Sequence, residues 1–214
     1  MATIYTNIKL GFIFVFMLMS TANPRRPDLD QLFGVAVGQA GYFTASQANE
    51  AGYSLQLLQH HLKRGSLERA GRGIFRFVRF PASDEEGFVV PWLWSEQRGV
   101  ISHESALQLH DLADALPARV HLTLPAADAG RRLRIPTNVA VAYADVPVGD
   151  IVQRGPVPVT SALRTLRDCI TAHVTPEWLQ QAIDRGLRRR LFARDDLAGQ
   201  RLPPGVSVPS HEAA

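Results

Sequence analysis

Side chains that can hydrogen-bond to flat polar partners recur between Ser54 and Lys63. Gln56, Gln59, His60 and Lys63 fall on the side of an expected helix that lies away from its leucines. A glutamine amide can form two hydrogen bonds with adenine, and lysine or arginine can bond guanine. The pattern therefore allows base contacts in the major groove of DNA, although a solvated helix face carries the same residue types.

A stripe of leucines sets the rotation of that helix. Ser54 is a good N-cap, and Leu55, Leu58 and Leu62 follow at positions i, i+3 and i+7, which predicts one buried face. Gly65 is expected to end the helix.

A shorter helix is expected before it, from residue 44 to residue 51. Thr44 and Gln47 form a capping box, and Gly52 can adopt the positive φ of a sharp turn. Two helices joined by a short turn that contains glycine are typical of a helix-turn-helix.

A β-hairpin is expected next, from residues 66–70 and 74–77 with glycines at its turn. A basic hairpin directly after such a helix is a wing that can reach phosphates beside the groove. The alternative is a small helical subdomain with a surface hairpin, as in some protein–protein modules. The candidate DNA-binding residues are Ser54, Gln56, Gln59, His60, Lys63, Arg64, Arg69, Arg72 and Arg76.

The charge distribution agrees with this placement. The 214-residue chain has a net charge of +3, but residues 25–80 hold eight Arg or Lys against four Asp or Glu. Residues 81–214 hold fourteen against sixteen, so the positive excess coincides with the expected DNA-binding unit. The single cysteine, Cys169, excludes an intramolecular disulfide and a multi-thiolate zinc site, which fits a reducing cytoplasm.

Residues 1–23 form an apolar extension with two interpretations. The run from Leu10 to Met19 follows Lys9 and resembles a secretory signal peptide. It is too short to span a membrane as a helix. Residues 1–23 also contain no arginine, whereas the rest of the chain has 21, which favours a start codon assigned too far upstream.

The predicted fold class is α+β, with an N-terminal winged helix-turn-helix over residues 28–80 and a mixed α+β domain over residues 84–199. The first helix should cover residues 28–40, with Asp28 or Asp30 as its cap. Leu29, Leu32, Phe33 and Ala36 should form its apolar face. In the second domain, helices are expected at residues 88–98, after Ser102, at 160–170 and at 176–190. Strands are expected at residues 120–124, 133–135 and 139–143, and residues 202–214 should be a disordered tail.

No catalytic residue, metal site or cofactor is expected. Ser102, His103 and Glu104 are triad-type residues, but neighbours on a helix point about 100° apart. His103 and His110 could share a helix face, but no HxxxH or CxxC pattern occurs to complete a metal site. Cys169 fits a small core residue better than a nucleophile. The basic run from Arg185 to Arg190 is either a solvated helix end or a second nucleic-acid contact.

Several short motifs occur in a fixed order between residues 28 and 195. They include Gly41-Tyr42-Phe43-Thr44, Arg72-Gly73-Ile74-Phe75-Arg76, Ser102-His103-Glu104-Ser105-Ala106-Leu107, Val120-His121-Leu122-Thr123-Leu124-Pro125 and Arg164-Thr165-Leu166-x-Asp168. As an ordered set they make the chain similar to the AbiEi antitoxins of type IV toxin–antitoxin systems.

That resemblance implies a transcriptional repressor that binds double-stranded DNA at inverted repeats in its own operon. It also implies a C-terminal domain that counteracts a nucleotidyltransferase toxin and need not form a stable complex with it. For such a protein we expect no membrane association and a cytoplasmic location. Two other classes stay open. One is a nucleic-acid-processing enzyme targeted by a winged helix, although no carboxylate–lysine nuclease pattern is present. The other is an exported interaction protein, which rests on residues 1–23 alone.

Overall fold

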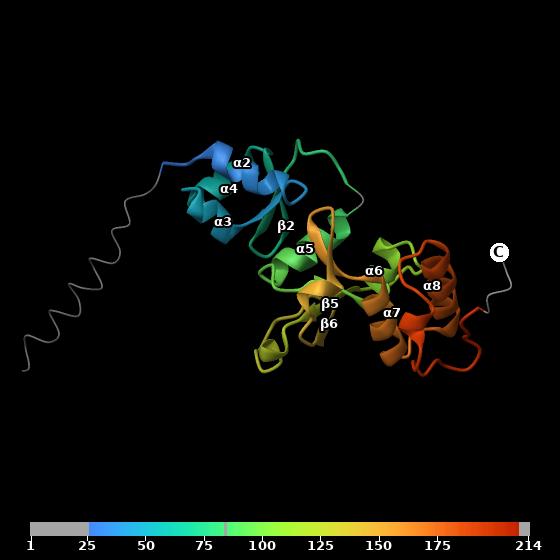
Figure 1. Ribbon diagram of the computed structural model, residues 1–214. Helices are drawn as coiled ribbons and strands as arrows, with labels where there is room; N and C mark the ends of the chain where they lie inside the picture. Colours follow the sequence, from blue (N-terminus) through green and yellow to red (C-terminus); the bar gives the residue numbers. More distant parts are fainter. Residues whose placement is uncertain (1–25, 84, 210–214) are drawn as a thin grey trace, which may run out of the picture.

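The structure, a computed structural model, describes residues 26–83 and 85–209. Within these residues the fold is mixed α and β, with seven α-helices and two sheets (Figure 1). The apolar segment 1–23 lies outside the described residues, so both interpretations of it stay open.

The N-terminal part, residues 28–80, contains three helices and a three-stranded sheet. In chain order these are α2 (Leu29–Val37), β1 (Tyr42–Thr44), α3 (Ala45–Glu50), α4 (Leu55–Lys63), β2 (Leu67–Gly71) and β3 (Ile74–Phe77). β1 and β2 both pair antiparallel with β3, so the strand order is β1-β3-β2. The expected hairpin is confirmed. The short strand β1 was missed because it pairs with a strand far along the chain, with Tyr42 opposite Arg76.

Side-chain caps start the three helices where the sequence predicts. The carboxylate of Asp28 accepts a hydrogen bond from the Gln31 amide at 2.9 Å and begins α2. Thr44 and Gln47 form a complete capping box at α3, and Ser54 caps α4. Each cap satisfies amides that the first helical turn leaves without partners.

The core of the N-terminal part lies between the helices and the small sheet. Its fully or almost fully buried members include Leu32, Ala36, Phe43, Ala48, Leu58 and Phe75. The predicted apolar face of α2 is half wrong, because Leu29 and Phe33 are 55% and 47% exposed. α2 turns Leu32 and Ala36 inward and leaves Leu29 and Phe33 largely exposed, although the Phe33 ring still meets the Phe77 ring edge-on with centroids 5.7 Å apart.

The C-terminal part, residues 85–209, is built on a mixed five-stranded sheet of order β6-β5-β4-β8-β7. Its helices are α5 (Glu86–Trp94), α6 (His103–Leu109), α7 (Ala162–Thr171) and α8 (Pro176–Arg188). Its strands are β4 (Val100–Ile101), β5 (Val120–Leu124), β6 (Val139–Tyr143), β7 (Ile151–Arg154) and β8 (Val157–Thr160). Short 3-10 turns lie at η1 (Ala126–Asp128), η2 (Val148–Asp150) and η3 (Asp195–Leu197).

The strand expected at residues 133–135 is wrong. Residues 133–135 form no strand, and the outer edge of β6 is left unpaired among the described residues. Ile135 is instead 43% exposed in the loop that leads into β6.

Helix α5 lies between the small sheet and the large one (Figure 1). Tyr42 and Ile74 of the small sheet share one buried cluster with Phe88 and Val89 of α5 and with Ile101 of the large sheet. The two parts therefore pack against each other through α5. The domain boundary expected between residues 80 and 84 stays a prediction.

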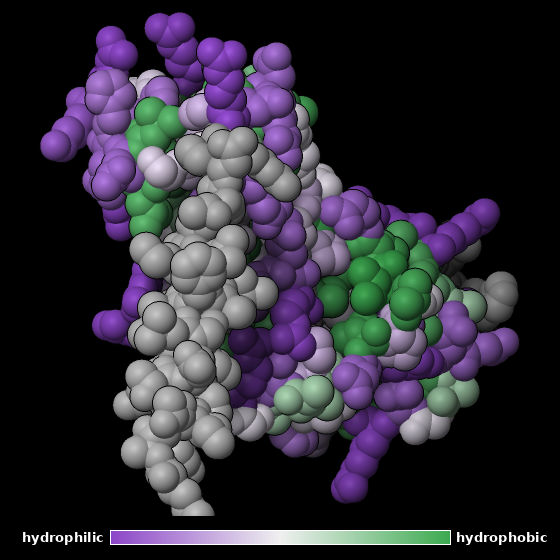
Figure 2. Space-filling view, turned by 90° about the vertical axis from the view of Figure 1, so that its left-hand side faces the viewer, coloured by the Kyte–Doolittle hydropathy of each residue, from purple (hydrophilic) through white to green (hydrophobic). Residues whose placement is uncertain are grey.

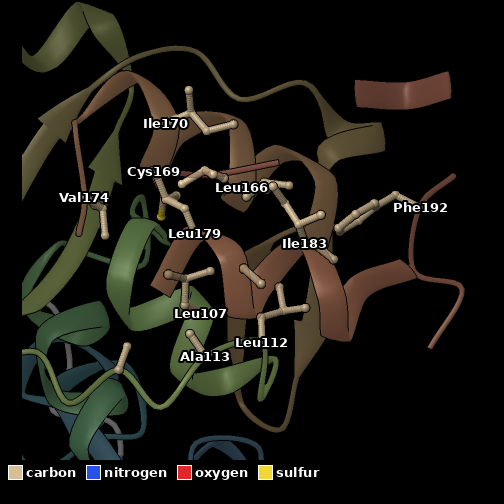
Figure 3. Packing of buried hydrophobic residues seen from close by; sticks show 14 of the residues in the cluster. Leu107, Leu112, Ala113, Leu166, Cys169, Ile170, Val174, Leu179, Ile183 and Phe192 are labelled. Atoms are coloured by element: carbon tan, nitrogen blue, oxygen red, sulfur yellow. The ribbon is translucent and has the colours of Figure 1, made fainter. Parts of the chain in front are cut away.

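A second apolar cluster holds α6, α7 and α8 together (Figure 3). Leu107, Leu166, Leu179 and Ile183 are fully buried there, and Cys169 is buried among them. Burial raises the pKa of the Cys169 thiol well above its ordinary value, so this thiol is a core group.

The disordered tail expected from residue 202 is wrong for residues 202–209. Val206 is buried in the cluster of α7 and α8, and Leu202 and Val208 pack against it. The Gln180 side chain also bonds both backbone groups of Ser207. Apolar residues among the prolines hold this segment onto the core, which its composition alone does not indicate. Residues 210–214 lie outside the described part.

Candidate nucleic-acid interface

One fully buried residue orients helix α4. Leu58 has no exposed surface, and Leu57 and Leu62 are partly buried beside it. The helix therefore turns its opposite side to solvent. The polar face of α4, defined as Gln56, Gln59, His60 and Lys63, is exposed throughout.

The expected burial of Leu55 is wrong, because 67% of its surface is exposed. Leu55 is the first helical residue after the Ser54 cap, and it lies next to Gln56 and Gln59 on the solvent side. The buried stripe contains Leu57, Leu58 and Leu62 instead. Three equally apolar leucines near the helix start allowed both rotations, and only the tertiary packing decides between them.

The turn before α4 is closed by backbone hydrogen bonds. The amide of Tyr53 donates to the carbonyl of Ala48 at 2.8 Å, and Gly52 has a φ of 82°. Ala48 is fully buried, so α3 packs closely beneath the turn. The Tyr53 ring contacts the His61 ring in a tilted arrangement, with centroids 5.9 Å apart, and this contact joins α4 to the turn.

The histidine pair of α4 is divided between two environments. His60 is exposed on the polar face, whereas His61 is partly buried and its Nδ1 lies 3.1 Å from the Ser66 hydroxyl. Burial, followed by the neighbouring charges of His60 and Arg64, lowers the pKa of His61. His61 is therefore a neutral structural residue at neutral pH.

Four of the basic candidates are free to meet an anion. Lys63, Arg64, Arg69 and Arg72 are exposed, and no carboxylate pairs with them among the described residues. The guanidinium of Arg69 lies 5.6 Å from the centre of the Phe75 ring, which holds its stem against the hairpin. Figure 2 shows hydrophilic side chains projecting from the top of the molecule, where the N-terminal part lies.

Arg76, unlike the exposed arginines Arg64, Arg69 and Arg72, is mostly buried and paired with carboxylates. Its guanidinium bonds Glu86 at 2.8 Å, Glu68 at 3.2 Å and the carbonyl of Phe80 at 2.9 Å. Only 11% of its side chain is exposed. Two carboxylates already neutralise it, so Arg76 connects the hairpin to α5 and is not placed to meet a phosphate.

The triad-type residues of the C-terminal part form a hydrogen-bonded cluster without an exposed nucleophile. Ser102 is fully buried and accepts a hydrogen bond from Thr123 at 2.8 Å. Its Oγ lies 2.9 Å from Nδ1 of His103, whose ring is 6.1 Å from that of His121. His121 in turn lies 3.5 Å from Glu104. A buried hydroxyl cannot meet a substrate, so the arrangement does not support serine catalysis.

His110 lies apart from His103. Its Nε2 is 2.7 Å from the carbonyl of Thr160, and its Nδ1 is 3.3 Å from the guanidinium of Arg154. The Nε2–H tautomer satisfies both contacts. Among the described residues, no group of three or more His, Cys, Asp or Glu side chains could hold a metal ion. No helix in the described ranges is long and apolar enough to cross a membrane.

The basic run at the end of α8 also has partners. Arg185 pairs with Asp114 at 2.7 Å, and Arg189 donates to the carbonyl of His110. Arg188 and Arg190 are exposed. Two of the four arginines are thus engaged in contacts within the chain, which favours a solvated helix end over a second nucleic-acid contact.

Comparison with protein families finds a match in the N-terminal part of the chain. Residues 30–78 match the AbiEi family model, described as "Transcriptional regulator, AbiEi antitoxin". The match runs from the second residue of α2 to just past β3 and therefore contains every candidate DNA-binding residue. The family description names a regulator and not an enzyme.

Comparisons with curated proteins and with solved structures give no further indication of function. No curated protein matches the chain. Among solved structures, the crystal structure of the RV2827C protein from Mycobacterium tuberculosis superposes with a TM-score of 0.47 and 18% identity. The superposition covers 80% of this chain and 70% of that one. A likeness of this degree assigns no function to the chain.

Proposed function

We propose that the chain is a DNA-binding transcriptional repressor whose N-terminal part is a winged helix-turn-helix. The observation that carries the proposal is the exposed polar face of α4, held outward by the burial of Leu58. Helix α3, the Gly52 turn, α4 and the β2–β3 hairpin follow in the order that such a unit requires. The AbiEi match over these residues supports the same function.

In this proposal α4 enters the major groove. Gln56 and Gln59 bond base edges, with His60 and Lys63 beside them, since the N-terminal half of such a helix faces the bases. Ser54, Arg64, Arg69 and Arg72 contact phosphates, which fix the register without reading sequence. Arg76 is left out because Glu68 and Glu86 hold its charge.

The wider biological role that we propose rests on the resemblance to AbiEi antitoxins, and the family match supports its regulator and antitoxin parts. We propose that the chain autoregulates its operon at inverted repeats in the cytoplasm and acts as the antitoxin against a nucleotidyltransferase toxin. Neutralisation is assigned to the C-terminal domain of residues 84–199, without a stable complex, a catalytic step or a cofactor. The full burial of Ser102 supports a domain without serine catalysis.

DNA binding is tested with the full chain and labelled duplexes. Fluorescence anisotropy should show tight binding to the region upstream of the chain's own gene. Binding to shuffled duplex of equal length should be at least about a thousandfold weaker. Equal affinity for the two duplexes would contradict a repressor function.

The antitoxin role needs a separate experiment in cells. Expression of the chain from an independent promoter should restore growth of cells that express the proposed toxin, a nucleotidyltransferase encoded next to the chain's own gene. Rescue should persist when Gln56 and Gln59 are both changed to alanine, since these residues lie outside the domain assigned to neutralisation. Failure of the wild-type chain to rescue growth would remove the antitoxin role and leave the repressor proposal intact.

A further inference from the structure

A groove with a volume of about 760 Å³ opens where the hairpin β2–β3, helix α5 and the segment 128–139 meet. This volume lies within the range of about 300–1,000 Å³ that is usual for small-molecule sites. The groove is lined by both parts of the chain, and ligand sites are often found at such junctions. None of the candidate DNA-binding residues except Arg72 lines it.

The floor of the groove is apolar. Ile74 of the hairpin, Val90 and Trp94 of α5, and Val139 of β6 all line it. Ile74 and Val139 are buried, whereas Trp94 is half-buried and presents part of its ring. An aromatic or aliphatic body would be desolvated on this floor, which favours binding by about 25 cal/mol per Å² of buried apolar surface.

The rim of the groove is basic. Arg72 lines it from the hairpin turn, and Arg131 and Arg134 line it from the segment before β6. Two carboxylates are also present. Asp128 is neutralised by Arg98 at 2.9 Å and by Arg131 at 3.4 Å, and exposed Glu96 lies 3.8 Å from Arg131.

Arg72 and Arg134 are the two arginines that stay available. Both side chains are exposed, and neither has an ion-pair or hydrogen-bond partner among residues 26–83 and 85–209. The groove and its immediate surroundings therefore carry four guanidinium groups, of Arg72, Arg98, Arg131 and Arg134, against the two carboxylates of Asp128 and Glu96. The net charge there is positive. Guanidinium groups bind carboxylate, sulfonate and phosphate oxygens in a two-pronged geometry.

We propose that this groove binds a small amphipathic anion, with an apolar ring or chain on the Trp94 floor and an acidic head group between Arg72 and Arg134. The apolar floor and the two unpaired arginines line the same groove, so a molecule with an apolar body and an anionic head can meet both. The site shares Arg72 with the proposed DNA contacts, but anion binding by the free chain does not rest on DNA binding.

A matched pair of fluorescent probes tests the site on the full chain. The first probe is 8-anilinonaphthalene-1-sulfonate, which has an aromatic body and one anionic head. The second is N-phenyl-1-naphthylamine, which has nearly the same body and no charge. The wild-type chain should bind the sulfonate saturably with one site, and decanoate should displace it.

Three variants distinguish the groove from other apolar surface. Arg134→Gln and Arg72→Gln should each weaken sulfonate binding about tenfold, the loss expected for one charge-assisted contact. Arg132→Gln is the control, because Arg132 is an exposed neighbour that does not line the groove. All three substitutions are at exposed positions, and thermal melting should show unchanged folding. The uncharged probe should bind all four chains equally.

Two results would overturn the proposal. One is a sulfonate affinity that Arg134→Gln and Arg72→Gln leave unchanged. The other is an equal loss with Arg132→Gln, which would show that general surface charge and not the groove attracts the probe.

Discussion

At the scale of single residues, Leu58 decides which side of α4 meets solvent. Leu58→Ala should lower the free energy of unfolding by roughly 2–5 kcal/mol, because the fully buried side chain leaves a cavity. Leu55→Ala is the matched control on the same helix and should change the free energy by less than about 0.5 kcal/mol. Urea denaturation measures both. A larger loss for Leu55→Ala would mean that the rotation of α4 is reversed.

Two arginines of the hairpin should behave differently although both were predicted to contact DNA. Arg69→Ala should reduce the salt slope of DNA binding by about one unit, because one phosphate contact is lost. Arg76→Ala should leave the slope unchanged and lower stability by roughly 1–3 kcal/mol, because Glu68 and Glu86 lose their partner. Salt titrations and urea denaturation measure the two effects. A reduced salt slope of DNA binding for Arg76→Ala would mean that Arg76 does contact a phosphate.

The residue-scale predictions from sequence failed where a local pattern allowed two solutions. Gln56, Gln59 and His60 are exposed as predicted, since polar residues on a short helix have only one favourable side. Leu55 and Arg76 could not be placed, because their environments depend on packing against distant segments. The partner of Arg76 that decides its role, Glu86, lies on α5.

At the scale of elements, close packing of Gly186 against the Phe192 ring fixes the end of α8. A Cβ added at Gly186 would overlap the ring of Phe192, which is buried in the cluster of α7 and α8. Gly186→Ala should therefore destabilise the chain by about 1–3 kcal/mol, the range for overpacked cores. Gly34→Ala in α2 is the control, because a Cβ there meets nothing within 4 Å. That change should stabilise the chain by about 0.5–1 kcal/mol. Thermal melting that ranks the two variants in the opposite order would contradict this packing.

Elements with their own start signals were predictable, and elements that depend on a partner were not. Asp28, Thr44 and Ser54 begin helices as predicted, because each cap is a contact within four residues. Strand β1 was missed and a strand at residues 133–135 was wrongly expected, because strand pairing is set by distant residues. The groove between the hairpin and α5 could not be predicted from sequence either, because segments far apart in the chain line it.

At the scale of the whole molecule, His110 joins four elements and should make stability depend on pH. It ends α6, bonds Thr160 of β8 and Arg154 of β7, and its carbonyl accepts from Arg189 after α8. Burial, with Arg154 and Arg189 nearby, lowers the pKa of His110, although the Thr160 carbonyl opposes this shift. In the unfolded chain the pKa returns to about 6.5.

The sign of the effect follows from the lowered pKa. Below about pH 6.5 the unfolded chain takes up a proton that the folded chain resists. Stability should therefore be complete above that pH and fall as the pH drops towards the folded pKa. His110→Gln keeps a donor for Thr160 and an acceptor for Arg154 but cannot titrate. Urea midpoints between pH 7.5 and 5.5 should fall less steeply for this variant, and equal slopes would exclude His110 as a source.

The central claim is that the polar face of α4 reads DNA sequence. The most direct test changes Gln56 and Gln59 together to alanine and measures anisotropy on the upstream duplex and on shuffled duplex. Each lost base contact should cost about 1–3 kcal/mol on the upstream duplex and little on the shuffled one, with the salt slope unchanged. Gln31→Ala, at an exposed glutamine of α2, should alter neither affinity. Equal losses on both duplexes, or no loss on either, would contradict the claim that α4 reads the bases.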